Sequence, residues 1–455
     1  MRSRSESRNP SPAAKLLRRF AYFRVSAARL PVVGWLGPGI AALAIFASSQ
    51  GRGQDALEVL KATQAAAEVR RTSLEYQPYT LKVDELRMLV ATSLEVDWND
   101  NINLAQNGAE SDFIVRPMAQ VTASWPVTQN SLLSLNVLGG YDQYLEHADY
   151  SYWHVGSGSG LALDLDVGQF TFDVHDRMEY LQDSAQQAAV AGTNSHGLRS
   201  AYGYFQNVAG VLGMWQLNDV VPSLGYDHEN FIASSGFSYA TRATEDFYAR
   251  SAFRVHPRLT VGPEATAGLT TYQEKVLNDN TGLSAGLFGD WRPNSALRVM
   301  LRAGSAVYLF EQTSRLTPPV KASNQNSWYL DLTAQHQVTD TISANLSAGH
   351  ELLLGVQSEI VDAWYLRPGL AWTVARDVSV RGVAFYEHGS QDLGALLGNL
   401  HEDYDWYGVG LGLTYSLWRN VKMSVDYRLT LRSSDLAFRT YTQDLVGLLL
   451  TYTFK

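Results

Sequence analysis

Four arginines lie in two segments in which every second residue is apolar. Arg298 and Arg302 alternate with aliphatic residues over 297–303, and Arg428 and Arg432 do so over 421–432. Successive side chains of a β-strand point to opposite faces, so each arginine pair shares one face with other polar residues. Guanidinium groups on the wall of a narrow, water-filled passage act on anions far more strongly than the same groups in bulk water. The pattern therefore fits selection among ions.

Acidic residues accompany these arginines on the faces that we predict to point inward. Asp426 shares a face with Arg428, and Asp331 is on a further alternating segment. We predict as pore-lining residues Arg298, Arg302, Arg428, Arg432, Asp426 and Asp331. Other charged residues on predicted inward faces are Arg116, Arg250, Arg254, Arg367, Arg381, Glu95, Asp97, Asp173 and Glu264. For any single one of them, a paired charge on a polar wall is the ordinary interpretation.

The sequence indicates no catalytic, cofactor or metal site. His175 shares a predicted face with Asp173 and Arg177, but the spacing places no serine beside it. His336 is predicted to face lipid or an edge. The acids Glu402, Asp403 and Asp405 lack the spacing of a calcium-binding loop, so we interpret them as solvated loop charges. The chain has no cysteine, which excludes disulfides and thiolate zinc sites.

The elements that position these residues are β-strands of membrane-spanning length. Segment 421–431 alternates apolar and polar residues throughout, and a tilted strand needs ~9–11 residues to cross a bilayer. Eighteen such segments follow Met88. We therefore predict an all-β, transmembrane, antiparallel up-and-down β-barrel of about eighteen strands, with sixteen as the alternative. A mean hydropathy of -0.16 is compatible with this fold, because polar inward residues dilute each strand.

Connections between the strands alternate in length, as they do in outer-membrane barrels, whose periplasmic turns are short and whose outer loops are long. The predicted short connections are 125–131, 166–170, 216–221, 256–260, 292–297, 338–342, 375–379 and 418–422. The predicted long ones are 99–112, 144–154, 182–202, 228–246, 273–281, 311–327, 353–362, 387–405 and 432–443. The alternation puts both ends of the barrel chain on the side of the short turns.

Tryptophans support two aromatic girdles at the membrane surfaces. Beside short connections stand Trp125, Trp215, Trp291, Trp372 and Trp418, and beside long ones stand Trp98, Trp153, Trp328, Trp364 and Trp406. A soluble core would instead collect them in the middle of strands.

Three features complicate the strand pattern. Pro117, Pro263 and Pro368 fall inside predicted strands although proline cannot donate a ladder hydrogen bond. Segment 381–386 loses the alternation, which suggests a glycine bulge. Strand 407–417 turns three glycines inward, which predicts an open, bare stretch of wall at Gly408, Gly410 and Gly412.

The N-terminus predicts export. Residues 1–30 hold eight basic residues and one acid, and they precede an apolar run at 31–46 and small residues at 47–49. This order is that of a signal peptide, with a single membrane anchor as the less favoured alternative. We predict a signal peptide at 1–49, a periplasmic, partly helical spacer at 50–87 and the barrel at 88–455. Removing 1–49 takes the net charge from -9 to about -16, which argues against a nucleic-acid partner.

Segment 94–102 and segment 111–117 resemble the first two strands of the outer-membrane β-barrel porins of the second type. In this chain, as in that family, an early strand ends in Asp-Asn-Ile-like residues, which are residues 100–102 here. The next strand opens with Ser-Asp and two hydrophobic residues, 111–114 here, and the pattern ends near Pro117. The resemblance implies an outer-membrane pore, and some members are linked to exopolysaccharide export. The terminal segment 452–455 resembles the aromatic signal that the barrel-insertion machinery reads, although Lys455 follows the phenylalanine.

The sequence thus predicts a porin-like channel for passive diffusion of small hydrophilic solutes. The alternatives are a conduit for exopolysaccharide export, in which 55–87 would contact periplasmic machinery, and a barrel with an adhesive or enzymatic role. Expected partners are outer-membrane lipid, the insertion machinery, and small solutes or polysaccharide; the oligomeric state is left open. Acids assigned to the long loops, including Asp227, Glu229, Glu387 and Glu402, predict a cation-attracting vestibule before a weakly anion-preferring pore.

Overall fold

The computed structural model describes residues 79–182, 203–234, 237–316, 322–393 and 400–454. The predicted signal peptide and the predicted helix of the spacer lie outside these residues. Within the described ranges, no helix has the length and apolar character needed to span a membrane.

Within the described chain, nineteen strands form one antiparallel sheet. The first ten are β1 (Leu81–Val83), β2 (Leu86–Asn99), β3 (Asp112–Thr128), β4 (Ser131–Tyr144), β5 (Tyr152–Val167), β6 (Phe170–Leu181), β7 (Tyr204–Trp215), β8 (Val220–Ala233), β9 (Arg242–His256) and β10 (Leu259–Tyr272). The others are β11 (Asn280–Trp291), β12 (Leu297–Phe310), β13 (Gln325–Thr339), β14 (Ile342–Leu354), β15 (Ser358–Ala375), β16 (Val378–Leu393), β17 (His401–Trp418), β18 (Val421–Ser434) and β19 (Tyr441–Thr453). Short 3-10 turns are η1 (Ala148–Tyr150), η2 (Ser238–Ala240) and η4 (Ala437–Arg439).

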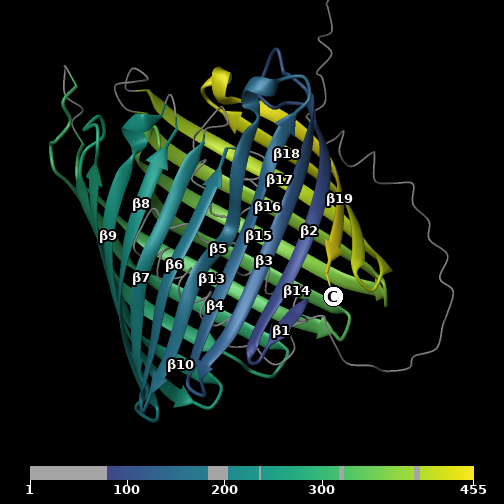
Figure 1. Cartoon of the computed structure of the whole chain (residues 1–455). Helices are drawn as coiled ribbons and strands as arrows, with labels where there is room; N and C mark the ends of the chain where they lie inside the picture. The colour runs from purple at the N-terminus through teal and green to yellow at the C-terminus, as the bar shows by residue number, and fades with distance from the viewer. Residues whose placement is uncertain (1–78, 183–202, 235–236, 317–321, 394–399, 455) are drawn as a thin grey trace, which may run out of the picture. The chain divides into compact units, whose positions relative to one another are not determined.

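Strands β2 to β19 close into a barrel of eighteen strands (Figure 1). Each strand pairs with its successor, and β19 pairs with β2 from Leu445 opposite Asn99 to Thr453 opposite Ala91. The predicted fold is confirmed, and the strand count is eighteen rather than sixteen. Strand β2 begins at Leu86, two residues before the predicted start of the barrel.

The alternation of short and long connections is confirmed, with one exception. The connection predicted as long at 353–362 is a turn of only three residues, because β14 continues to Leu354 and β15 begins at Ser358. Other strands also run further than predicted toward this side: β8 reaches Ala233, and β17 begins at His401. Strands of 12–18 residues exceed what a bilayer requires, so they extend into water, where charged residues no longer mark their ends. We call this side of the barrel the long-loop end and the opposite side the short-turn end.

Each of the three prolines predicted to fall inside strands lies where the hydrogen-bond ladder is interrupted on one side only. Pro117 stays opposite Leu94 of β2, but pairing with β4 skips positions 116 and 117. Pro263 keeps its partner on β11 and lacks one on β9, and Pro368 keeps its partner on β14 and lacks one on β16. The register is the same before and after each gap. The missing N–H is therefore accommodated without a bulge.

Two expectations about the wall are wrong. Segment 381–386 pairs with β17 in unbroken register, so no glycine bulge is present there. The glycines of β17 are not bare either: a Cβ at Gly408 would overlap the Phe385 ring, and one at Gly410 would meet Val383. Side chains of the neighbouring strand lie over these glycines and fill the space that their missing side chains leave.

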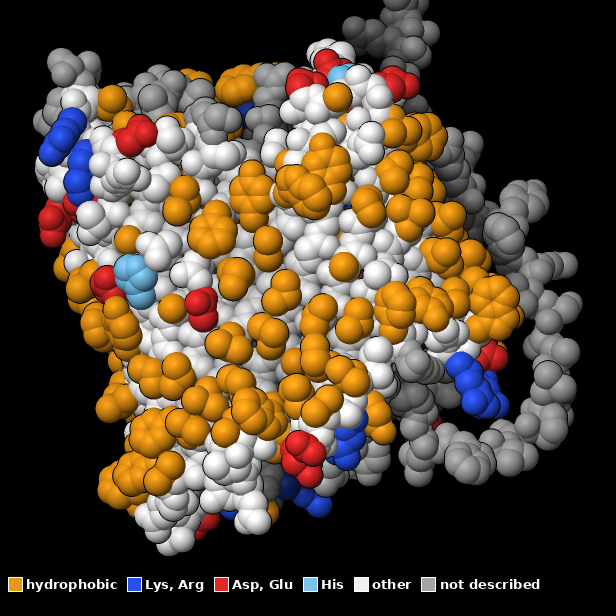
Figure 2. Space-filling model, in the orientation of Figure 1, with side chains coloured by type: hydrophobic (Ala, Val, Ile, Leu, Met, Phe, Trp, Pro, Cys, Tyr) orange, Lys and Arg blue, Asp and Glu red, His pale blue; other side chains and the backbone are white. Residues whose placement is uncertain are grey.

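The outward-facing residues form an apolar surface (Figure 2). On β17, for example, Tyr407, Leu411 and Leu413 are exposed on this face. Nine of the ten tryptophans beyond residue 49 are exposed, as expected for two girdles. The exception is Trp406, which points inward, is 6% exposed and packs edge-on against Phe385. Its predicted place in the girdle at the long-loop end is therefore wrong.

The short strand β1 lies within the predicted spacer and pairs with the start of β2. A two-residue turn joins them, in which Asp84 has a φ of 51°. Because β3 occupies the other side of β2, strand β1 lies on the same side as β19, just below the last residues of that strand. Thr80 contacts the chain end there, since its hydroxyl donates a hydrogen bond to the Phe454 carbonyl.

Candidate functional site at the long-loop end of the lumen

The β14–β15 connection folds into the barrel instead of standing outside it. Val356 is 1% exposed and packs in one cluster with Leu181, Tyr204 and Phe231 of β6, β7 and β8. In a ring of eighteen strands, β15 and β7 are eight strands apart, which places them on nearly opposite walls. Residues 355–359, here called the inward tip, therefore reach across the lumen.

A buried ion-pair cluster holds the wall beside the inward tip. Glu402 is 0% exposed and accepts hydrogen bonds from Arg432 Nη2 and from Arg439 Nε, both at 2.9 Å. The guanidinium of Arg432 also lies over the Tyr404 ring, 3.8 Å from its centroid. Burial lowers the pKa of Arg439 in turn η4, and the Glu402 carboxylate opposes that shift.

Two hydrogen bonds connect the inward tip to this cluster. Arg439 Nη1 donates to the Gln357 side-chain oxygen at 2.7 Å. Ser358 Oγ donates to Gln391 Oε1 at 2.8 Å, and Gln391 Nε2 in turn donates to Glu402 Oε2 at 2.7 Å. The position of the tip is thus coupled to a charge network on β16, β17, β18 and η4.

The inward tip is also bound to two neighbouring loops. Glu359 accepts from the backbone N–H of Asn278 at 3.1 Å and from its side-chain amide at 2.7 Å. Asn278 Oδ1 accepts from the backbone N–H of Ser314 at 3.0 Å. The connections after β10 and β12 therefore support the tip from one side.

A second segment fills the long-loop end near the seam of the barrel. Ile102, in the connection after β2, is 4% exposed and packs against inward-facing Ile114, Tyr144 and Tyr152. The side-chain amide of Asn101 donates to the carbonyl of Thr442 on β19 at 2.8 Å. This connection lies inward like the tip and starts from the wall six strands away in the ring of eighteen.

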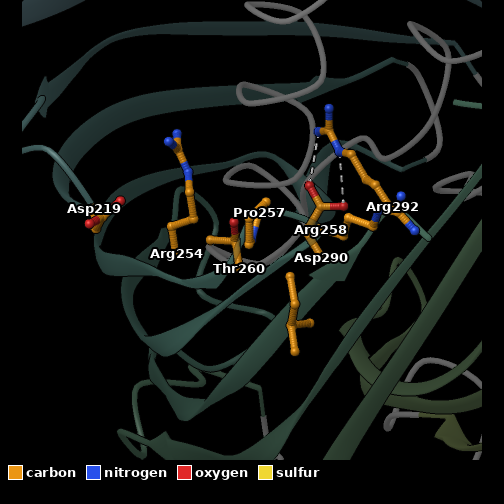
Figure 3. A pocket seen from close by; sticks show the side chains of 8 residues that line it. Asp219, Arg254, Pro257, Arg258, Thr260, Asp290 and Arg292 are labelled. Carbon is orange, nitrogen blue, oxygen red and sulfur yellow. Dashed lines mark hydrogen bonds and ion pairs between the residues drawn. The ribbon is translucent and has the colours of Figure 1, made fainter. Parts of the chain in front are cut away.

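The short-turn half of the lumen is more open. The inward pair Arg381 and Asp426, 2.7 Å apart, keeps side-chain exposures of 43% and 32%. Val383 is also exposed although it points inward. A polar cavity of about 540 Å³ lies at the rim of this end (Figure 3) and is lined by Asp219, Arg254, Pro257, Arg258, Leu259, Thr260, Asp290 and Arg292. Solvent therefore reaches inward side chains here.

The predicted pore-lining residues occupy different environments and do not form one ladder. Arg298 donates to both oxygens of Asp290 at 3.1 and 3.0 Å. Arg302 is 2% exposed, lies 3.9 Å from Glu264 and is the register partner of Asp331. On the inward face of β18, Arg428 and Asp426 are half-buried and Arg432 is buried. The two arginine pairs, on β12 and β18, are six strands apart.

Several acids assigned to outer loops line the interior instead. Asp227, Glu229, Glu387 and Glu402 are each at most 2% exposed and lie in strands. The interpretation of Glu402 as a solvated loop charge is wrong, because the strands extend past the membrane band. These four acids therefore do not belong to the predicted cation-attracting vestibule of the outer loops.

The histidine expectations are met where the structure describes them. His175 shares the inward face with Asp173, which it contacts at 2.6 Å, and its other ring nitrogen lies 3.0 Å from Asp227. His336 is exposed on the outward face of β13. In the part of the chain that the structure describes, no group of three or more His, Cys, Asp and Glu side chains is arranged to hold a metal ion.

The sequence did not point to the inward tip or to Arg439. Val356, Gln357 and Ser358 have the composition of any surface turn, and Arg439 follows no strand periodicity. The one available signal was the run of apolar residues at 352–354, which leads into the turn without a solvating residue.

Searches of known proteins give structural similarities only. No protein-family model and no curated protein matches the chain. Among solved structures, the Acinetobacter baumannii protein OccAB3 is 11% identical with a TM-score of 0.43, covering 81% of this chain and 99% of that one. Pseudomonas aeruginosa OccK2 (OpdF), crystallised with glucuronate, is 12% identical with a TM-score of 0.46, covering 83% and 99%. The P. aeruginosa outer-membrane protein OpdK is 12% identical with a TM-score of 0.43, covering 80% and 98%.

The architecture itself defines a class. A closed antiparallel barrel with an even strand number, an apolar outer face, flanking tryptophans and a polar interior is that of an outer-membrane β-barrel.

Proposed function

We propose that the protein is an outer-membrane channel for the passive diffusion of small hydrophilic solutes, narrowed at its long-loop end by the inward tip. The observation that carries the proposal is a lumen that is polar along its wall, solvent-accessible in its short-turn half and crossed by one folded-in connection in the other half. A barrel of this strand number is too wide for wall side chains alone to fill.

The size limit follows from what fills the long-loop half. The inward tip and the connection after β2 approach from different parts of the ring, and both are anchored by side-chain hydrogen bonds. A passage that remains between such segments admits small solutes and excludes folded proteins. The polar wall favours hydrophilic solutes over apolar ones, since an apolar solute would gain nothing by leaving lipid for it.

The expected charge preference is weakly anionic and arises in the short-turn half. Arg302 and Arg432 are buried beside carboxylates, which reduces their field in the lumen. Arg254 and Arg258 instead line the solvent-accessible cavity of about 540 Å³, where the acid Asp290 already binds Arg292 and Arg298. The local surplus of positive charge attracts small anions.

Single-channel recording in planar bilayers tests the proposal. Wild-type protein should give discrete conductance steps, and the double variant Val356→Gly with Gln357→Gly should give larger steps because it removes the packing and the Arg439 hydrogen bond of the tip, two of its four anchors. Asn420→Gly, in a turn at the short-turn end, is the matched control and should leave the step size unchanged. Correctly folded wild-type protein that gives no steps would overturn the channel function.

A further inference from the structure

A polar patch interrupts the apolar outer face over β6 to β9. Its members point away from the lumen and are neighbours on four adjacent strands. They are Asp176, Asn207, His228, Asn230 and Glu245. Figure 2 shows acidic and histidine side chains among apolar ones on the part of the surface formed by these strands.

Contacts across strands make these residues one continuous patch. The Asn207 amide donates to the Asp176 carboxylate, and Asn207 is the register partner of Asn230. His228 Nδ1 lies 3.0 Å from Glu245 Oε1, and the Tyr226 hydroxyl donates to Glu245 Oε2 at 2.5 Å.

The patch lies within the apolar band and not at its edge. On β8, exposed Leu224 lies on one side of His228 and exposed Ile232 on the other, with exposures of 69% and 50%. On β6, Val174 precedes Asp176 and Met178 and Tyr180 follow on the same face. Ionisable groups at this depth are unfavourable against lipid hydrocarbon.

Two of the other histidine–carboxylate pairs on the outer face show what is unusual here. His388 and Asp405 have the same geometry, at 3.0 Å with the Tyr386 hydroxyl on the acid, but beyond them β16 and β17 carry only polar outward residues. That pair therefore lies at the rim of the band.

The second pair is covered within the chain. His350 contacts Asp362 at 2.9 Å and is 3% exposed, because its ring lies between Trp328 and Trp364. His228 and Glu245 have no such cover, with side-chain exposures of 36% and 40%.

We propose that the outer face of β6 to β9 is an interface with a second copy of this chain in the membrane. Between the large apolar residues around the patch, the outward face also carries small ones, namely Ala209, Gly213, Ala243, Ala249 and Ala267, and at these positions another backbone can approach closely. Small residues together with hydrogen-bonding side chains promote the association of transmembrane helices, and this barrel face offers the same close approach and polar pairing. The patch is self-complementary, because it holds amide and imidazole donors together with two carboxylate acceptors, as a twofold interface requires.

The absence of cysteine from the sequence allows a direct test with single introduced thiols. Ala209→Cys lies on the outward face of β7, next to His228 in register, and Ala384→Cys is the matched position on β16. In outer-membrane vesicles, a short bis-maleimide cross-linker should produce dimers from Ala209→Cys and not from Ala384→Cys. Equal yields from the two, or dimers from neither, would overturn the interface.

A second pair of variants tests the role of the charges. In the Ala209→Cys background, His228→Leu with Glu245→Leu should abolish cross-linking, whereas His388→Leu with Asp405→Leu should preserve it. Heat-modifiable gel migration verifies that every variant is folded. If the His228 and Glu245 double variant still cross-links like its parent, the polar patch does not hold two copies together and the proposal fails.

Discussion

The two halves of the lumen use the same strands but treat their inward charges differently. In the long-loop half, Glu402 is fully buried between Arg432 and Arg439. In the short-turn half, Asp426 faces Arg381 across a pair that remains in contact with solvent. The strands therefore do not decide what a charge does. Coverage by folded-in connections converts surface-like ion pairs into structural ones.

The largest effect is expected from removing the buried acid. Glu402→Gln leaves two buried guanidinium groups without a counter-charge, and breaking a buried pair in this way costs about 3–5 kcal/mol. Unfolding by urea in lipid vesicles should measure the loss. Asp426→Asn is the control in the open half, where an exposed pair is worth about 0–1 kcal/mol. Equal losses of unfolding free energy in the two variants would mean that ion pairs contribute the same stability in both halves of the lumen.

Apolar packing should show the same contrast with a smaller amplitude. Ile102→Ala removes side-chain volume from a closely packed cluster and should lower the free energy of unfolding by about 2–4 kcal/mol. Val383→Ala, at a 42% exposed inward position, should change it by less than about 0.5 kcal/mol. A large loss of unfolding free energy for Val383→Ala would mean that Val383 packs in a buried cluster.

Ion selectivity should depend on the charges in the short-turn half of the lumen. Arg254→Gln with Arg258→Gln should shift the zero-current potential in a salt gradient toward cation preference, because both groups line the solvent-accessible cavity. Arg298→Gln leaves Asp290 with Arg292 alone and should shift it less. Planar-bilayer recordings give both values. A larger shift in the zero-current potential from Arg298→Gln than from the Arg254 and Arg258 double variant would favour Arg298 and Arg302 as the selectivity site.

The smallest effect is expected at the barrel seam. Thr80→Val removes the hydroxyl that donates to the Phe454 carbonyl and accepts from the Val90 N–H, a loss of about 1 kcal/mol. The rate of unfolding in urea should rise about fivefold, since 1.4 kcal/mol corresponds to a factor of ten. Thr92→Val, on the outward face of β2, should leave the rate unchanged.

Much of the barrel was predictable because period-two alternation and turn length are local properties. The eight short turns, the strand number and the outward face follow from such patterns. The candidate site was not predictable in the same way. Glu402 meets Arg439 and Gln357 through loops that fold inward, and no spacing rule joins residues 357, 402 and 439.

The misplaced acids and the misplaced Trp406 have one cause. Because a membrane strand needs only ~9–11 residues, the sequence pattern predicts strand ends near the charged residues at 227, 229, 387 and 402. The strands continue into water for several residues, so Trp406 and Glu402 belong to the interior of the barrel. Membrane thickness sets the minimum length of a strand and not its end.

Strand β1 has a consequence for how the molecule meets other chains. Residues 86–90 of β2 extend beyond the end of β19, which would leave a row of unpaired backbone groups at the short-turn end. Such a row is a template on which a strand from another molecule can add. Because β1 occupies this row and Thr80 joins it to the last residues of the chain, the sheet edge left at the seam of the described barrel is reduced to the three residues of β1. Seven residues ahead of the barrel thus protect it against edge-to-edge aggregation.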